Sequence, residues 1–250
     1  YSSAAYIDGE REFARRAFIK SLQGQSVTAL LPDEFADDNG GFSSAYKLQI
    51  PHPPGAPMFV LLGRVFIIFF GDNPQTAALA VNSMSAIASG FTILFLFWTI
   101  THFAKRILVA KSGTELTNNQ ILLVMGAGVV GALAYTFSDS FWYSAVEGEV
   151  YALSSFFTAL VFWAILKWEQ IAEEPKADRW IILIAYLVGL SIGIHLLNLL
   201  AIPAVALVIY FRKTKKPTLK GMAISGLLGV ITLGAIQNFI IPQLVNVAAK

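Results

Sequence analysis

Residues 180–211 read WIILIAYLVGLSIGIHLLNLLAIPAVALVIYF, and this run decides the fold. Its 32 residues include no Asp, Glu, Lys or Arg. A helix needs only about 20 apolar residues to cross a bilayer, so the run is too long for one span. We therefore predict two helices, about 180–195 and 202–211, joined by a short break. The residues that weaken a continuous helix here are Gly189, Gly193, His195, Asn198 and Pro203.

Other apolar runs flank this one, at about 76–104, 120–138, 150–168 and 221–241. The chain is 56% hydrophobic and 14% charged, and its mean hydropathy is +0.62. A soluble domain would have about a quarter of its residues charged. The sequence therefore predicts an all-α, polytopic transmembrane helical bundle, with the lipid bilayer as its surroundings.

The N-terminal part differs from the rest. Residues 1–50 are polar and are expected to form an extracytoplasmic loop segment, and the transmembrane domain is expected to cover 51–250. Between them lies His52-Pro53-Pro54-Gly55-Ala56-Pro57, which cannot be helical until Pro57 begins a helix. The following apolar stretch, 57–70, is too short to span and contains Arg64, so we expect an interfacial or re-entrant helix.

The basic residues predict the orientation. Three connections, 105–119, 167–179 and 212–220, hold eleven Lys and Arg, whereas 71–75, 139–149 and 195–201 hold none. The positive-inside rule makes the first three cytoplasmic. The loops alternate correctly only if 180–211 is broken. The acid-rich N-terminal segment, His52, Glu147, Glu149, His195 and Asn198 then all lie on the extracytoplasmic side.

Glu147 and Glu149 are expected at the start of a membrane helix, near Tyr151, which is a candidate substrate-binding residue. Carboxylates at a helix N-terminus stabilise the helix dipole, and aromatic residues are common at membrane interfaces. The alternative is that the pair binds a metal, a sugar hydroxyl or an acceptor. Residues two apart on a helix point in different directions, so a shared target would need a non-helical stretch, which Gly148 permits.

Three further polar side chains lie among apolar residues. His195 and Asn198 are three apart and could face a cavity, or be satisfied by a neighbouring helix. Arg64 could extend to the interface, or bind a phosphate or pyrophosphate with its forked donors. Each is a candidate substrate-binding residue.

Several classes of function lack support in the sequence. There is no cysteine, so no thiolate metal site or cysteine nucleophile exists. The net charge of +2 does not indicate nucleic acid as a partner. We find no Walker motif, dinucleotide fingerprint or zinc-ligand spacing, and we assign no metal ligand.

Three stretches carry a family resemblance: AYKLQIPHPPGAPMFVLLGRVF, SFWYSAVEGEVYALSSFFTAL and GLSIGIHLLNLLAIPA. In this order they resemble the bacterial multipass family once called domain of unknown function 2723. That family is now grouped with the protein O-mannosyltransferase-like glycosyltransferases, as glycosyltransferase family 117. The resemblance implies a GT-C-like fold, a polyprenyl-phosphate-linked sugar as donor, and transfer on the extracytoplasmic side.

The resemblance also implies roles for residues. The family shows Trp-Asp-Cys-Gly-Glu-Phe before its Tyr-Lys-Leu run, and Asp38 falls at that aspartate, although the tryptophan, cysteine and glutamate are absent here. Asp38 is thereby the expected general base toward a Ser or Thr hydroxyl of a secreted or membrane protein, with Glu147 and Glu149 as further catalytic candidates. His52, Arg64 or His195 would stabilise the departing phosphate. A carboxylate-held divalent metal is compatible with this chemistry but not required.

Two other classes of function are compatible with the sequence. The broken run 180–211 could line the path of a transporter or lipid flippase, and the altered acidic motif allows a non-catalytic lipid-binding scaffold. The resemblance implies a bacterial inner membrane protein with an extracytoplasmic active face. Because the chain begins with Tyr1, we expect a fragment of a longer protein.

Overall fold

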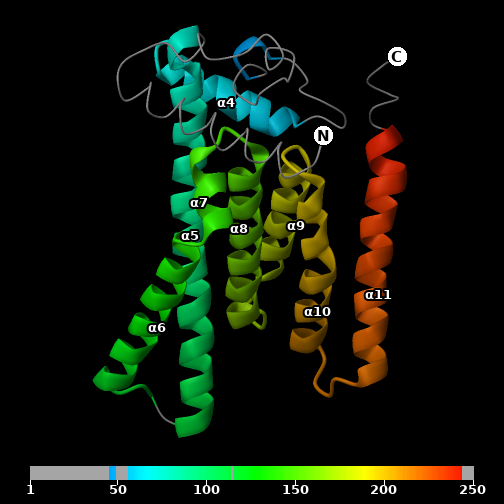
Figure 1. Cartoon of the computed structure of the whole chain (residues 1–250). Helices are drawn as coiled ribbons and strands as arrows, with labels where there is room; N and C mark the ends of the chain where they lie inside the picture. Colours follow the sequence, from blue (N-terminus) through cyan, green and yellow to red (C-terminus); the bar gives the residue numbers. More distant parts are fainter. Residues whose placement is uncertain (1–44, 49–55, 114, 244–250) are drawn as a thin grey trace, which may run out of the picture. The chain divides into compact units, whose positions relative to one another are not determined.

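The computed structural model describes residues 45–48, 56–113 and 115–243 (Figure 1). In these ranges the chain is helical, without strands, as the apolar runs predict. The elements are α4 (Pro57–Phe69), α5 (Pro74–Ser112), α6 (Asn118–Thr136), α7 (Asp139–Val146), α8 (Val150–Ile171), α9 (Asp178–Ile192), η2 (Leu196–Leu200), α10 (Ala201–Lys213), α11 (Leu219–Ala235) and the π-helical turn η3 (Ile236–Ile240).

The described residues form two compact units. The first contains the residues up to Gly90 together with Ser138–Leu153, and the second contains Phe91–Phe137 and the residues from Ser154 onward. The predicted domain boundary at residue 50 lies outside the described residues and stays a prediction.

Helix α4 belongs to the first unit and crosses the first half of α5 rather than running alongside it (Figure 1). Its 13 residues extend for about 20 Å, which is too short for a span and agrees with an interfacial helix. A turn with positive φ at Gly71 and Asp72 ends it. Pro74 then starts α5, and the side chain of Asn73 accepts a hydrogen bond from the Gln75 N–H at 2.9 Å.

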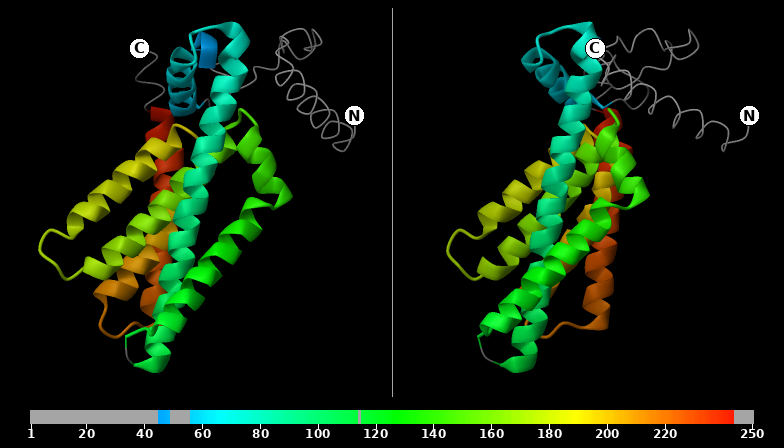
Figure 2. Two further views of the ribbon diagram at one scale, coloured as in Figure 1. Left: turned by 90° about the vertical axis from the view of Figure 1, so that its left-hand side faces the viewer. Right: turned by 60° about the vertical axis from the view of Figure 1, so that its left-hand side comes forward.

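Helices of the second unit run alongside one another (Figure 2). They pack through apolar side chains and glycines. Helices α8, α9 and η2 enclose a buried cluster that includes Ile165, Trp168, Ile184 and Leu199. Helix α6 approaches α5 closely at Gly128, where an added Cβ would lie 2.5 Å from the Thr101 methyl group. The small residue therefore sets the separation of these two helices.

The predicted break in 180–211 is confirmed. Helix α9 ends at Ile192, His195 is extended, and the chain continues as the 3₁₀ turn η2 and then α10. Lys213 Nζ lies 3.9 Å from Asp178 Oδ1, so the end of α10 returns to the start of α9 and the two helices form a hairpin. The reversal places the basic connections at 167–179 and 212–220 at one end of this unit.

Five helical stretches are long and apolar enough to cross a membrane: Pro74–Ala110, Asn118–Thr136, Val150–Ile171, Leu196–Lys213 and Leu219–Gln243. They correspond to five of the predicted spans. The remaining predicted span, 180–195, is occupied by α9, whose 15 residues extend for only about 22 Å. Helix α5 is longer than predicted, with 39 residues, because residues 105–112 contain no glycine or proline and the helix continues to Gly113, which has a φ of 66°.

Candidate functional site

The Glu147–Glu149 segment is not helical. Helix α7 ends at Val146, α8 begins at Val150, and Glu147 has extended backbone (φ −95°, ψ 143°). Residues 147–149 form a bend between the two helices. The helical geometry that would point residues two apart in different directions therefore does not apply to this pair. Glu147 is half-buried and Glu149 is exposed.

Two glycines bring α4 and this connection to the same position on α5. An added Cβ on Gly63 would lie 3.6 Å from Val81 Cγ2, and one on Gly148 would lie 3.3 Å from Val81 Cγ1. Val81 is fully buried. Both glycines therefore lie close to the Val81 side chain. Arg64 is next to Gly63 on α4, and Glu147 and Glu149 flank Gly148 on the loop.

Arg64 is held by an ion pair. Its Nη1 lies 2.6 Å from Asp72 Oδ1, and its Nη2 donates to Oδ2 at 3.2 Å. The guanidinium also lies 5.3 Å from the centre of the Tyr46 ring. A phosphate at this position would share or replace the Asp72 contact.

Two predicted residues, Asp38 and His52, lie outside the described residues, and their roles stay predictions. Tyr151, the remaining predicted residue of the first unit, is 51% exposed on the first turn of α8, two residues after Glu149. Its role in substrate binding stays a prediction.

Asn198 and His195 belong to the second unit. Asn198 is buried, and its Oδ1 accepts hydrogen bonds from the Ser154 and Thr158 hydroxyls of α8, both at 2.8 Å. His195 Nδ1 accepts from the Leu197 N–H at 3.2 Å and caps η2. Asn198 therefore has partners on a neighbouring helix, as one of the two sequence interpretations expected, whereas the His195 hydrogen bond is local to η2.

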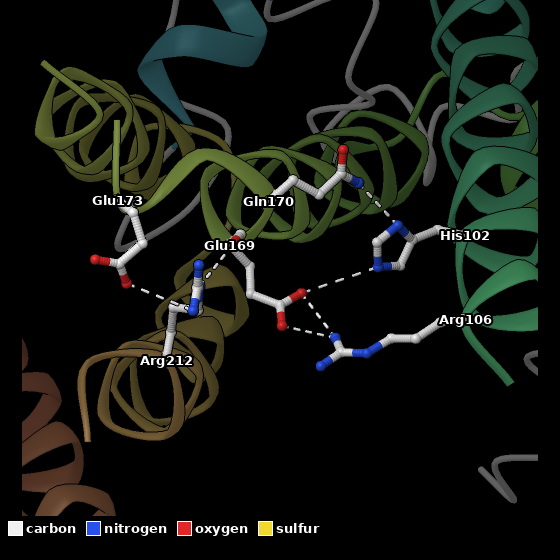
Figure 3. Close-up of polar contacts among 6 residues, drawn as sticks. All are labelled: His102, Arg106, Glu169, Gln170, Glu173 and Arg212. Atoms are coloured by element: carbon white, nitrogen blue, oxygen red, sulfur yellow. Dashed lines mark hydrogen bonds and ion pairs between the residues drawn. The ribbon is translucent and has the colours of Figure 1, made fainter. Parts of the chain in front are cut away.

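The sequence interpretation missed a polar cluster around Glu169, at the basic end of the second unit (Figure 3). Arg106 Nη1 contacts both carboxylate oxygens of Glu169, at 2.6 and 2.8 Å, and His102 Nε2 lies 3.9 Å from Oε2. Arg212 Nε donates to the Glu169 main-chain oxygen at 2.8 Å. Helices α5, α8 and α10 thus meet here, so the three basic connections share one end of the unit.

The sequence does contain a signal for this cluster, in the form of charged residues within or near the ends of apolar spans. Glu169 is an acidic residue near the end of an apolar span, and Lys105-Arg106 interrupts another span with four apolar residues following it. Only the packing of α5 on α8 brings these positions together. Among the described residues, no group of three or more His, Cys, Asp or Glu side chains is arranged to hold a metal.

The fold defines a polytopic α-helical membrane protein with a carboxylate-bearing loop beside a short crossing helix. A family model described as the protein O-mannosyl-transferase TMEM260 N-terminal domain matches residues 38–218. The chain belongs to this family. The match agrees with the predicted O-mannosyltransferase-like resemblance, whereas membership of glycosyltransferase family 117 stays a prediction.

Two curated relatives carry the same description. The chain is 25% identical to "Protein O-mannosyl-transferase tmem260" of Dictyostelium discoideum over 159 residues, which are 62% of this chain and 17% of the relative. It is 23% identical to the Mus musculus protein over 167 residues, 66% of this chain and 21% of the relative. The aligned part thus spans about a fifth of these relatives. No solved structure matches the chain.

Proposed function

We propose that this chain is the membrane part of a glycosyltransferase that moves a mannose-like sugar from a polyprenyl-phosphate donor to a Ser or Thr hydroxyl of a protein. The observation that carries the proposal is the family match over residues 38–218, since the similar curated proteins are named O-mannosyl-transferases. The GT-C type and the extracytoplasmic active face are part of the proposal. A bacterial inner membrane location follows only from the first resemblance.

The reaction is a displacement at the anomeric carbon. The acceptor hydroxyl loses its proton to a carboxylate while its oxygen forms the new bond to that carbon. The bond from the anomeric carbon to the phosphate oxygen breaks, and the polyprenyl phosphate leaves with the electron pair. A cation near the leaving oxygen lowers the cost of the developing charge.

The first unit supports this chemistry. Its loop presents Glu147 and Glu149 from non-helical backbone, and its crossing helix presents Arg64. The proposed base is Asp38, with the two glutamates as alternatives or as ligands for sugar hydroxyls. Arg64 is the proposed phosphate contact, in exchange for part of its pairing with Asp72.

Membranes containing the protein, a radiolabelled polyprenyl-phosphate mannose and a Ser/Thr peptide test the proposal. Label should appear in the peptide. Asp38→Asn should lower transfer by roughly 10²–10⁴-fold, the usual contribution of a general base. Glu174→Gln is the matched control, because Glu174 is an exposed carboxylate in the α8–α9 connection of the other unit and should change nothing.

The variants also discriminate between the bases. If Asp38→Asn retains transfer while Glu147→Gln or Glu149→Gln abolishes it, the base lies on the α7–α8 loop and the alignment at Asp38 is wrong. Absence of label with the unaltered protein would contradict the enzyme proposal. Movement of the donor lipid between leaflets without transfer would instead indicate the transporter alternative, and binding alone the scaffold alternative.

A further inference from the structure

A hollow in the second unit lies between α5, α6 and α8, near the basic connections. Its volume is about 990 Å³, at the upper end of the roughly 300–1,000 Å³ that is usual for ligand pockets. Its apolar lining includes Trp98, Val124, Met125 and Trp163, and its polar lining includes Lys105, His102, Lys167 and Gln170. None of these residues contributes to the proposed transfer site.

Two of the polar residues that line the hollow are bonded to each other. His102 on α5 and Gln170 on α8 are joined by a 2.9 Å hydrogen bond between Nδ1 and the amide nitrogen (Figure 3). The neighbouring Arg106 is already neutralised by Glu169. Lys105 and Lys167 are exposed, and neither is ion-paired within the part of the chain that the structure describes.

Both lysines extend from membrane-spanning helices. Lys105 is followed on α5 by the apolar residues 107–110, and Lys167 by Trp168 on α8. Lys167 Nζ also lies 5.7 Å from the centre of the Trp163 ring. A basic pocket between spans, with aromatic residues below the charges, matches the chemistry of a lipid with an anionic head group and apolar chains.

One acidic residue also lines the hollow. Glu115 lies exposed in the connection before α6. With the Arg106–Glu169 pair neutral, the two lysines leave an excess of one positive charge, which favours an anionic over a zwitterionic head group. Because the hollow combines a large apolar wall with this charge, a free phosphate would leave most of its surface unused.

We propose that this hollow binds an anionic phospholipid from the leaflet that contains the basic connections. The phosphate lies between Lys105 and Lys167, and an acyl chain lies along Trp98, Trp163 and Met125. Binding here is distinct from donor binding at the glycosyl-transfer site and does not depend on the proposed function.

Quenching of tryptophan fluorescence by brominated lipids tests the proposal, because Trp98 and Trp163 line the hollow. The full chain in zwitterionic detergent is titrated with phosphatidylglycerol or phosphatidylcholine, each with brominated acyl chains. Brominated phosphatidylglycerol should quench saturably at low mole fraction, and brominated phosphatidylcholine should quench only weakly. The Trp98→Phe/Trp163→Phe variant should lose the saturable part.

Charge variants provide the controls. Lys105→Gln/Lys167→Gln should weaken the apparent affinity for phosphatidylglycerol by roughly thirtyfold, as expected for two lysines near a lipid surface. Lys215→Gln/Lys216→Gln removes the same charge from the exposed α10–α11 connection and should have little effect.

Three results would overturn the proposal: equal quenching by both lipids, an equal effect of the two lysine pairs, or an unchanged apparent affinity for phosphatidylglycerol in Lys105→Gln/Lys167→Gln. Displacement of brominated phosphatidylglycerol by a polyprenyl phosphate at a lower mole fraction than by phosphatidylglycerol itself would also overturn it, because the hollow would then prefer the donor type of lipid.

Discussion

Asn198 shows how single polar residues are accommodated in the apolar bundle. Its amide oxygen accepts two hydroxyl hydrogen bonds from α8, and its Nδ2 donates to the Ser191 main-chain oxygen at 3.4 Å. An unpaired polar group in this environment is costly. The three contacts join η2 to α8 and α9, so Asn198 holds the break in place.

Replacing Asn198 with Ala should destabilise the protein by about 1–3 kcal/mol, because the Ser154 and Thr158 hydroxyls lose a buried partner. Thermal unfolding in detergent measures the loss. Leu200→Ala is the control, since Leu200 is 63% exposed on the same segment and should change the midpoint little. Equal midpoints for Asn198→Ala and the unaltered protein would show that these hydrogen bonds contribute nothing.

Glu169, like Asn198, has partners that lie far away in the sequence. A double-mutant cycle with Glu169→Gln and Arg106→Gln should give a coupling free energy of roughly 0.5–1 kcal/mol, reduced by solvent because the Arg106 side chain is 59% exposed. Chemical denaturation of the four proteins measures it. Strict additivity of the two single changes would contradict a direct interaction.

At the scale of helices, glycines decide where two elements approach each other. On α6, an added Cβ at Gly128 would lie 2.5 Å from Thr101 and 2.8 Å from the Phe97 ring, whereas Gly126 has open space around it. The two positions are on one helix and two residues apart. They form a matched pair for testing the α5–α6 contact.

Gly128→Leu should destabilise the α5–α6 hairpin by about 1–3 kcal/mol, because the added side chain forces the helices apart. Gly126→Leu should be neutral or slightly stabilising, since Leu favours helix more than Gly does. Thermal unfolding of both variants in detergent gives the comparison. A similar loss of thermal stability in both variants would contradict this expectation. It would show that helix propensity or membrane insertion of α6, and not its contact with α5, determines the effect.

At the scale of the whole molecule, the basic connections predict which parts face the cytoplasm. The chain has no cysteine, so single cysteines can be introduced without removing any. Cysteines at Ser140 and Lys215 should react with a membrane-impermeant maleimide from opposite sides, with Ser140 extracytoplasmic. Labelling of both from the same side would reject the orientation and the proposed active face.

The sequence alone determined the helical class, the short non-spanning length of the helix in 57–70 and the break in 180–211. These depend on local composition: span length follows from bilayer thickness, and a 32-residue apolar run with internal glycines and polar residues exceeds one crossing. The distribution of lysine and arginine also predicted that the three basic connections share one side. The contacts of Arg106 and Arg212 with Glu169 agree within the second unit.

Only the tertiary structure decided the partners of the polar residues. Asn198 pairs with residues 40 and 44 positions earlier, and Arg106 with one 63 positions later. Nothing in local spacing indicates these pairs, because they depend on which helix faces touch. The surroundings of the other predicted residues also come from packing within each unit: Gly148, between the two glutamates, lies against Val81, and Asn198 joins η2 to α8 and α9.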